Sequence, residues 1–220
     1  MAIQHEDLSL WAVVTADQRN SRRSLDQVPG ALEALDATVG DRFVLGFERT
    51  AGDELQGLTR DAGAVVDAVL TLTEAPHWHI GIGIGTVEQP LPTSTREARG
   101  PAYLAARQAV ERARSAPAHL RLVCAETVGD PTYGVIVTQR TARAEAALVL
   151  LRALVSRRTP EGWEIMQVLS ETGSGRAAAE RLGISASAVS QRATRSARAE
   201  SQLGAELARA LLAEVLAVPA

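Results

Sequence analysis

"HIGIGIG", residues 79–85, alternates isoleucine with glycine and decides how the front of this chain folds. Side chains of a β-strand point alternately to opposite faces, so Ile80, Ile82 and Ile84 share one face and glycines occupy the other. That bare face lets a helix or a nucleotide approach the strand closely. A dinucleotide fingerprint is excluded, because that motif needs its third glycine three residues after the second and a helix directly after it. Here the glycines alternate strictly and prolines follow.

Strand and helix signals alternate on both sides of this strand. "LSLWAVVTA" (8–16) predicts a first strand, and "DRFVLGFERTAGDELQGLT" (41–59) predicts two more about Gly52 and Asp53, the strongest hairpin signal in the chain. "HLRLVCA" (119–125) predicts a further strand, and helices are predicted over 25–39, 60–73 and 102–115. The order βαββαβ with an added αβ favours an α/β or α+β sheet domain.

Composition excludes several kinds of protein. The chain has 23 arginines and no lysine. It therefore has no lysine for a Schiff base or for a phosphate-binding loop. Cys124 is the single cysteine and cannot form an internal disulfide. The N-terminus lacks the pattern of a signal peptide, and the longest apolar run is too short to cross a bilayer. We therefore expect a cytoplasmic protein without a membrane segment.

Charge is distributed unevenly along the chain. Residues 1–138 carry 12 arginines against 18 acidic residues, a net of -6, whereas residues 139–200 carry 10 against 6, a net of +4. An acidic front and a basic rear predict two domains with different partners, and the partner of the rear domain is expected to be a polyanion. The predicted boundaries are a sheet domain over 1–126, a connecting helix over 127–158 and a helical domain with a C-terminal helix over 159–220.

The rear domain contains a stretch that fits a helix-turn-helix, "RAAAERLGISASAVSQRATRSA" (176–197). Ala179 is the small residue needed where two helices cross at short range, and Gly183 supplies the positive φ of the turn. Leu182, Ile184 and Val189 are expected to bury between the helices. The residues left to contact DNA are short polar side chains for base edges and an arginine stripe for phosphates: Ser185, Ser187, Ser190, Gln191, Thr194, Arg192, Arg195 and Arg198. The alternative is an ordinary helical hairpin with a solvated arginine face.

In the front domain, two aspartates are expected to converge. Asp17 follows the first strand and Asp53 lies at the tip of the hairpin, and in a palm-type domain these two elements lie side by side. Two neighbouring carboxylates repel each other unless a divalent cation neutralises them, and oxygen ligands favour Mg²⁺ or Mn²⁺. The alternative is a tight turn whose acidic residues face water.

The motifs "TADQRNSR", "TAGDELQGL", "IGIGIG" and "GPAYLAARQAVERAR" resemble those of the SatD family, bacterial proteins linked to stress-response operons. The same segments are similar, more distantly, to nucleotidyl and diguanylate cyclases. The resemblance implies a ferredoxin-like palm followed by a helix-turn-helix, an α+β fold class with an all-α tail. It also implies metal binding by Asp17 and Asp53, with Glu54 adjacent.

Two departures from the cyclase pattern shape the expected function. Ala51 replaces the first glycine of the hairpin. Because the chain has no lysine, arginines would have to bind the triphosphate, namely Arg19, Arg22, Arg96 or Arg99. We assign no catalytic residue and expect a DNA-binding regulator whose palm binds a nucleotide and a divalent metal. Two alternatives stay open: an active nucleotidyl cyclase or transferase, and a degenerate palm that serves only as a dimerisation scaffold.

The last helix, 203–218, is apolar over most of its circumference. Such a helix must be covered by its own chain or by a second subunit. Helix-turn-helix proteins commonly bind two half-sites as dimers, which favours a homodimer. The alternative is that this helix folds back onto the connecting helix.

Overall fold

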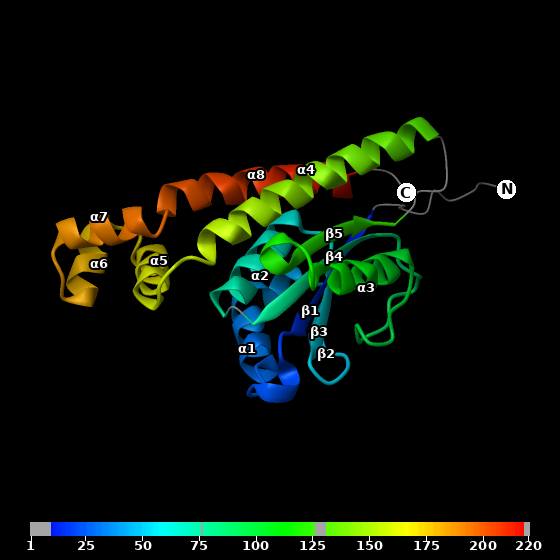
Figure 1. The fold of residues 1–220 in the computed structure, drawn as a ribbon, viewed down its shortest axis with the longest axis horizontal. Helices are drawn as coiled ribbons and strands as arrows, with labels where there is room; N and C mark the ends of the chain where they lie inside the picture. The colour runs from blue at the N-terminus through cyan, green and yellow to red at the C-terminus, as the bar shows by residue number, and fades with distance from the viewer. Residues whose placement is uncertain (1–9, 76, 126–130, 218–220) are drawn as a thin grey trace.

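The computed structural model describes residues 10–75, 77–125 and 131–217. These residues form five β-strands and eight α-helices in an α+β arrangement (Figure 1). The strands are β1 (Trp11–Gln18), β2 (Leu45–Arg49), β3 (Glu54–Thr59), β4 (Trp78–Gly85) and β5 (Leu120–Cys124). The helices are α1 (Val28–Val39), α2 (Ala62–Glu74), α3 (Pro101–Ala113), α4 (Pro131–Val155), α5 (Pro160–Thr172), α6 (Gly175–Leu182), α7 (Ala186–Arg195) and α8 (Arg198–Leu216). None of these helices is both long and apolar enough to cross a membrane.

The five strands form one mixed sheet in the order β2-β3-β1-β4-β5. β1 lies between β3 and β4 and is antiparallel to both, whereas β5 is parallel to β4. The predicted hairpin is confirmed: β2 and β3 are antiparallel, and Gly52 takes a positive φ of 53° in the turn between them. The central position of β1 places its last residues beside the hairpin turn and the start of β4.

One face of β4 packs against α3 more closely than any residue with a Cβ would allow. A Cβ at Gly81 or Gly83 would overlap backbone atoms of Ala106 and its neighbours on α3, and at Gly85 it would lie 2.9 Å from the Ala102 nitrogen. The bare strand face predicted from the sequence is therefore filled by a helix. Small residues on α3 complete this contact, since Ala102 and Ala106 are fully buried.

The opposite face of the sheet carries the main hydrophobic core. Ile80, Ile82 and Ile84 are fully buried there, together with apolar residues of α1 and α2. Asp61 caps α2 by accepting from the Gly63 and Ala64 amides at 2.7 and 3.1 Å, which fixes where that helix begins. α4 and α8 extend the same core, so the sheet lies between α3 on one side and these four helices on the other.

The rear of the chain forms a separate small core. Ile165 and Val168 of α5, Ala178 and Ala179 of α6, and Val189 of α7 are buried together. In Figure 1 these three helices lie at one end of an elongated molecule, and α4 and α8 run side by side from that end along the sheet.

The course of α8 differs from the predicted domain division. Ala205, Ala208 and Leu212 are buried in the core of the sheet domain, so α8 packs on α4 and α2 and not with α5–α7. The reason is its pattern: small alanines and leucines recur at helical spacing and match the apolar face of α4. Of the two alternatives for this helix, the structure has the fold-back onto the connecting helix. The predicted boundary between residues 126 and 127 lies outside the described residues.

The glycine face of β4 gives a direct stability prediction. Gly83→Ala should lower the free energy of unfolding by about 1–3 kcal/mol or more, because α3 must move away to accommodate the methyl group. The matched control is Gly46→Ala on β2, where a Cβ would meet no atom within 4 Å and should change stability by less than about 0.5 kcal/mol. Urea denaturation measures both variants. Equal stability of the two would contradict the close packing described above.

Candidate functional site

An open pocket of about 940 Å³ lies at the end of β1. It is bounded by the turn that follows β1, by the tip of the β2–β3 hairpin and by the start of β4. Charged side chains dominate its lining: Asp17, Arg19, Arg22, Arg23, Asp26, Asp53 and Arg114. His79 and several short polar residues of the turn complete it.

The sheet register brings Asp17 and Asp53 to this pocket from positions 36 residues apart in the chain. Asp17 lies opposite Glu54 on β3 and opposite His79 on β4. The amide of Gln18 donates to the Asp53 carbonyl at 3.0 Å, which ties the hairpin turn to the end of β1. Glu54 does not line the pocket, and its carboxylate accepts from the Thr50 hydroxyl at 2.5 Å.

Asp17 is held in a place that disfavours its charge. Its side chain is 14% exposed, and burial raises its pKa above the ordinary value. The Arg114 guanidinium, 3.2 Å from the carboxylate, opposes this rise, while the negative charge of Asp53 adds to it. The net direction is upward, so ionised Asp17 costs the folded protein stability.

A half-buried histidine forms part of the inner wall of the pocket. His79 has its pKa lowered to about 4, mainly by burial and then by the nearby charges of His119 and three arginines, so it is neutral at physiological pH. Its ring lies edge-on to that of His119 at 5.1 Å, and the Nδ1 atoms of both are buried with no hydrogen-bond partner among the described residues. Four arginines and three aspartates line the pocket, and this small excess of positive charge favours an anionic ligand.

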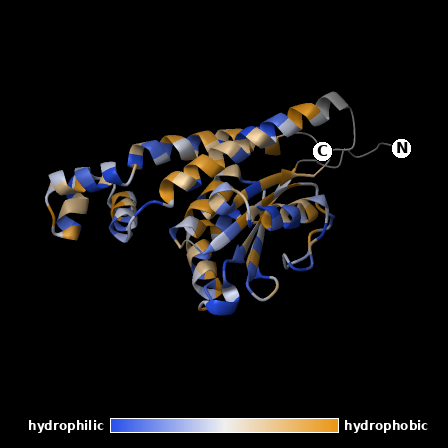
Figure 2. Cartoon of the chain, in the orientation of Figure 1, coloured by the Kyte–Doolittle hydropathy of each residue, from blue (hydrophilic) through white to orange (hydrophobic). Residues whose placement is uncertain are grey.

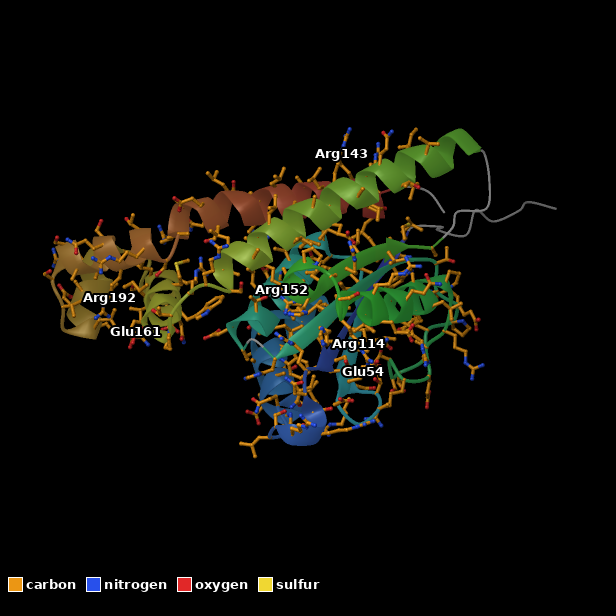
Figure 3. The ribbon with its side chains drawn as sticks, in the orientation of Figure 1. Glu54, Arg114, Arg143, Arg152, Glu161 and Arg192 are labelled. Carbon is orange, nitrogen blue, oxygen red and sulfur yellow. The ribbon has the colours of Figure 1, made fainter. Side chains whose placement is uncertain are left out.

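Arg152 of α4 supports this wall from behind. It is 4% exposed and donates hydrogen bonds to the carbonyl of Trp78, the residue before His79, and to the carbonyl of His119 itself. Figure 3 places it where the end of α4 lies over the sheet. Burial lowers its pKa to about 10, so the guanidinium stays charged at neutral pH. α4 is thereby fixed directly to the pocket.

The predicted phosphate-binding arginines divide into two groups. Arg19 and Arg22 line the pocket, as expected for a shared site. Arg96 and Arg99 do not: they lie on the loop between β4 and α3, where Arg96 is 4.0 Å from Glu48 of β2. The structure does not bring these two to the carboxylates, because the loop folds over the β2 side of the sheet.

Sequence reasoning missed Arg23, Asp26, His79 and Arg114 as pocket residues. A signal for Arg114 exists in the sequence. A helix that follows β4 and packs on its glycine face must run back along the strand, so the last turn of α3 lies near the start of β4 and beside Asp17. Asp26 offers no such signal, because its place depends on its 2.5 Å ion pair with Arg49.

The residues that could hold a metal in this pocket are Asp17 and Asp53. No group of three or more histidine, cysteine, aspartate or glutamate side chains in the described chain is arranged to hold a metal by itself. Mg²⁺, however, is usually bound by one or two carboxylates together with substrate phosphates and water. Asp17 and Asp53 fit that pattern, and arginines for the phosphates line the same pocket.

A second candidate surface is formed by α7. A three-residue turn separates α6 from α7, and Gly183 in it has a φ of 62°. Ser185 caps α7, its hydroxyl accepting from the Ala188 amide at 3.1 Å. Of the predicted DNA contacts, most are exposed on this helix, namely Ser185, Ser187, Ser190, Gln191, Thr194 and Arg195.

The remaining two predicted contacts are half-buried. Arg192 lies 3.7 Å from Glu164 of α5. Arg198 begins α8 beyond the end of α7. The continuous arginine stripe predicted from the sequence is therefore interrupted, because one of its three members is engaged within the helical unit.

No protein-family model matches this chain, and no curated protein matches it. The resemblance to SatD proteins and to cyclases therefore stays a prediction that rests on the quoted motifs.

The opposite environments of two pocket aspartates predict opposite effects on stability. The pKa of Asp17 is raised in the folded state, so the protonated carboxyl group stabilises the fold at a pH below the unfolded pKa of 3.8. This stabilisation is lost as the pH rises through the folded pKa. Asp17→Asn should therefore raise the free energy of unfolding at pH 7, and the gain should vanish near pH 3.

Asp26 is the matched control for this experiment. Asp26 accepts hydrogen bonds from Arg49 and from the Val28 amide, and these lower its pKa. Its ionised carboxylate therefore stabilises the fold at a pH above the unfolded pKa of 3.8, and this stabilisation is lost as the pH falls through the lower folded pKa. Asp26→Asn should lower stability at pH 7. Urea denaturation from pH 3 to 8 measures both variants. A loss of stability in both at pH 7 would contradict the environment described for Asp17.

Proposed function

We propose that this protein is a DNA-binding regulator in which α5–α7 form a helix-turn-helix and the sheet domain is a ferredoxin-like palm that binds a nucleotide with a divalent cation. One observation carries the DNA-binding part: α6 and α7 meet through a three-residue turn at Gly183, and the outer side of α7 is covered by short polar side chains. In this proposal α7 enters the major groove.

Internal contacts support α7 as a rigid recognition helix. Val189 is 3% exposed, and Ala193 also packs against the small core, so the inner side of α7 is fixed against α5 and α6. Arg181 of α6 pairs with Glu171 of α5 at 2.5 Å, which holds the first helix of the motif in place. The outer side is thus free to contact base edges, with Ser187, Ser190 and Gln191 as hydrogen-bonding groups.

Phosphate contacts would come from the C-terminal end of α7 and from the start of α8. Arg195 is exposed there, whereas Arg192 is engaged with Glu164. Arg195 is therefore our principal phosphate contact, and Arg198 is a secondary one.

The order of strands and the pocket support the palm. The order β2-β3-β1-β4 with antiparallel neighbours is that of a ferredoxin-like sheet, to which β5 is added. Asp17 costs stability when ionised, yet it sits beside Asp53 in a pocket rich in arginine. Burying a charge without a net stabilising partner is typical of a binding or catalytic site.

When bound, a divalent cation would supply positive charge to the two carboxylates and to the phosphates of the nucleotide. Asp17 and Asp53 would hold it, and Arg19, Arg22 and Arg23 would bind the phosphates. Arg22 and Arg23 are exposed and form no ion pair with other described residues, so their charge is available to a ligand.

A chain of hydrogen bonds offers a route from the pocket to the DNA-binding helices. Arg152 binds the pocket wall to α4, and Arg158, just after α4, donates to the Ser196 carbonyl and the Ser201 hydroxyl at the junction of α7 and α8. A ligand that shifts the start of β4 would thereby move the base of α7. This requires unequal affinity for two arrangements of the tail.

DNA binding is tested by fluorescence anisotropy with labelled genomic fragments over a range of salt concentrations. Affinity should fall steeply as salt rises, because neutralised phosphates release counterions. Arg195→Ala should weaken binding to all fragments and reduce the salt slope by about 1. Arg107→Ala is the control, since Arg107 is an exposed arginine of α3. No binding by the intact chain, or equal losses in both variants, would argue against this proposal.

Nucleotide binding is tested by calorimetry with ATP and GTP, with and without Mg²⁺. Asp53→Asn should weaken Mg²⁺-dependent binding by about tenfold or more, because one of two carboxylate ligands is lost. The control is Asp36→Asn, on the exposed side of α1. Unchanged binding in Asp53→Asn would exclude the proposed site.

An active nucleotidyl cyclase or transferase is the second candidate, favoured by the two aspartates in one pocket. Analysis of products after incubation with the same nucleotides and Mg²⁺ separates the two. Formation of a cyclic or transferred product that is lost in Asp17→Asn would establish the enzyme.

A further inference from the structure

The outward face of the α4–α8 pair is unusually apolar. Five of the eight large hydrophobic side chains that are well exposed in the described chain belong to these two helices: Val135, Ile136, Leu150, Leu203 and Leu207. Leu150 is 71% exposed and Leu203 67%. Orange segments recur along both helices in Figure 2. Isolated exposed leucines are ordinary, but a cluster on one face marks an interaction surface.

Three of these residues, Leu150, Leu203 and Leu207, lie on two stripes at helical spacing. On α8, Leu203 and Leu207 are four residues apart and are extended by the exposed Ala199 and Ala210. On α4, the exposed Ala142 and Ala146 lead to Leu150 with the same spacing of four. Residues three or four apart lie on one side of a helix, so each helix presents a continuous apolar strip.

The pairing of the two helices brings the strips to the same level. Leu151 of α4 faces Gly204 of α8, where a Cβ would lie 3.3 Å from the leucine Cδ1. Near the other end, Arg140 donates to the Glu214 carbonyl at 3.0 Å. The helices are therefore antiparallel, with Leu150 and Leu203 each adjacent in sequence to the Leu151–Gly204 contact.

No element of the described chain covers this face, since Leu150 and Leu203 stay exposed. The inner sides of both helices are already filled by the core, through residues such as Leu148, Leu151 and Leu212. The outer strips lie on the opposite side, and in Figure 1 that side of α4 and α8 faces away from the sheet. Within the described chain this face is therefore left open to a second molecule.

The charges beside the strips differ in sign between the two helices. Arg143 is exposed on α4, and Figure 3 places it on the outer side of that helix. Glu200, Glu206 and Glu214 are exposed on α8. Among the residues described, none of these four side chains forms an ion pair. A two-fold rotation would place Arg143 of one copy opposite the acidic side chains on α8 of the other, so the surface is complementary in charge to itself.

We propose that a second copy of this chain covers the face, with α4 of each protomer lying over α8 of its partner. A two-fold axis parallel to the helices keeps positions at the same level, so Leu150 would face Leu203 and Leu207 of the other protomer. Arg143 would then approach Glu214 across the interface. This homodimer differs from one made by an isolated C-terminal helix, because α8 is already packed within its own chain and only its outer strip is shared.

The arrangement places both α5–α7 units at the same end of the dimer. If the proposed DNA binding is correct, the two α7 helices would be positioned for two half-sites of one operator. The dimer itself is argued from the apolar strips and their charges and does not depend on DNA or nucleotide.

Analytical ultracentrifugation of the intact chain tests the dimer. The expected mass is twice the protomer's 23.3 kDa. Leu203→Glu should raise the dimer Kd by about a hundredfold or more, because an unpaired carboxylate would be buried at the interface. Leu104→Glu is the matched control: Leu104 is 68% exposed on α3, away from the strips, and its variant should stay dimeric. Circular dichroism confirms that each variant is folded.

A wild-type mass of 23.3 kDa at the highest soluble concentration would overturn the proposal. So would an unchanged dimer in Leu203→Glu, or an equal loss in Leu104→Glu. The two-fold arrangement has its own test. Arg143→Glu and Glu214→Arg should each weaken the dimer, and the double variant should recover at least part of the loss. No recovery would overturn the proposed orientation. These readouts need neither DNA nor nucleotide, so they fail or succeed separately from the proposed function.

Discussion

The contact between the glycine face of β4 and the backbone of α3 is the constraint on which the front of the molecule depends. Without Cβ atoms at Gly81 and Gly83, α3 lies directly on the strand. It runs back along β4 and ends at Arg114, which there reaches Asp17 at 3.2 Å. The same strand pairs with β1, whose end carries that aspartate. Packing of two elements thus sets the distance between the charges of the pocket.

The pocket combines a buried carboxylate with an excess of basic groups, and the two features have a common physical meaning. Asp17 alone costs stability when ionised, and Asp53 makes this cost larger. Among the described residues, Arg22 and Arg23 of the pocket form no ion pair, and the Nδ1 atom of His79 has no hydrogen-bond partner. A cation with an attached polyphosphate would satisfy both needs at once, whereas either partner alone would satisfy only one. Arg152 and Arg158 extend these contacts along α4 toward the helices of the tail.

Local patterns predicted the elements well, and tertiary contacts account for what they missed. Alternating glycine and isoleucine gave β4 and its bare face, and Gly52 with Asp53 gave the hairpin. Gly183 marked the turn between α6 and α7. Arg96 was misplaced and Arg114 overlooked, because the path of a loop and the end point of a helix depend on packing that is distant in sequence. For α8 the sequence left two covers open for the same reason: its pattern predicts burial but not the surface that buries it.

The central claim is that Asp17 and Asp53 share one cation, and Mn²⁺ titration followed by NMR tests it most directly. Paramagnetic broadening depends steeply on distance, so it locates a bound ion without reference to activity. With a nucleoside triphosphate present, the account predicts early broadening confined to amides of residues 17–24, 52–54 and 79. Broadening that begins at the acidic outer side of α8, or that is unchanged when both aspartates are replaced by asparagine, would contradict it.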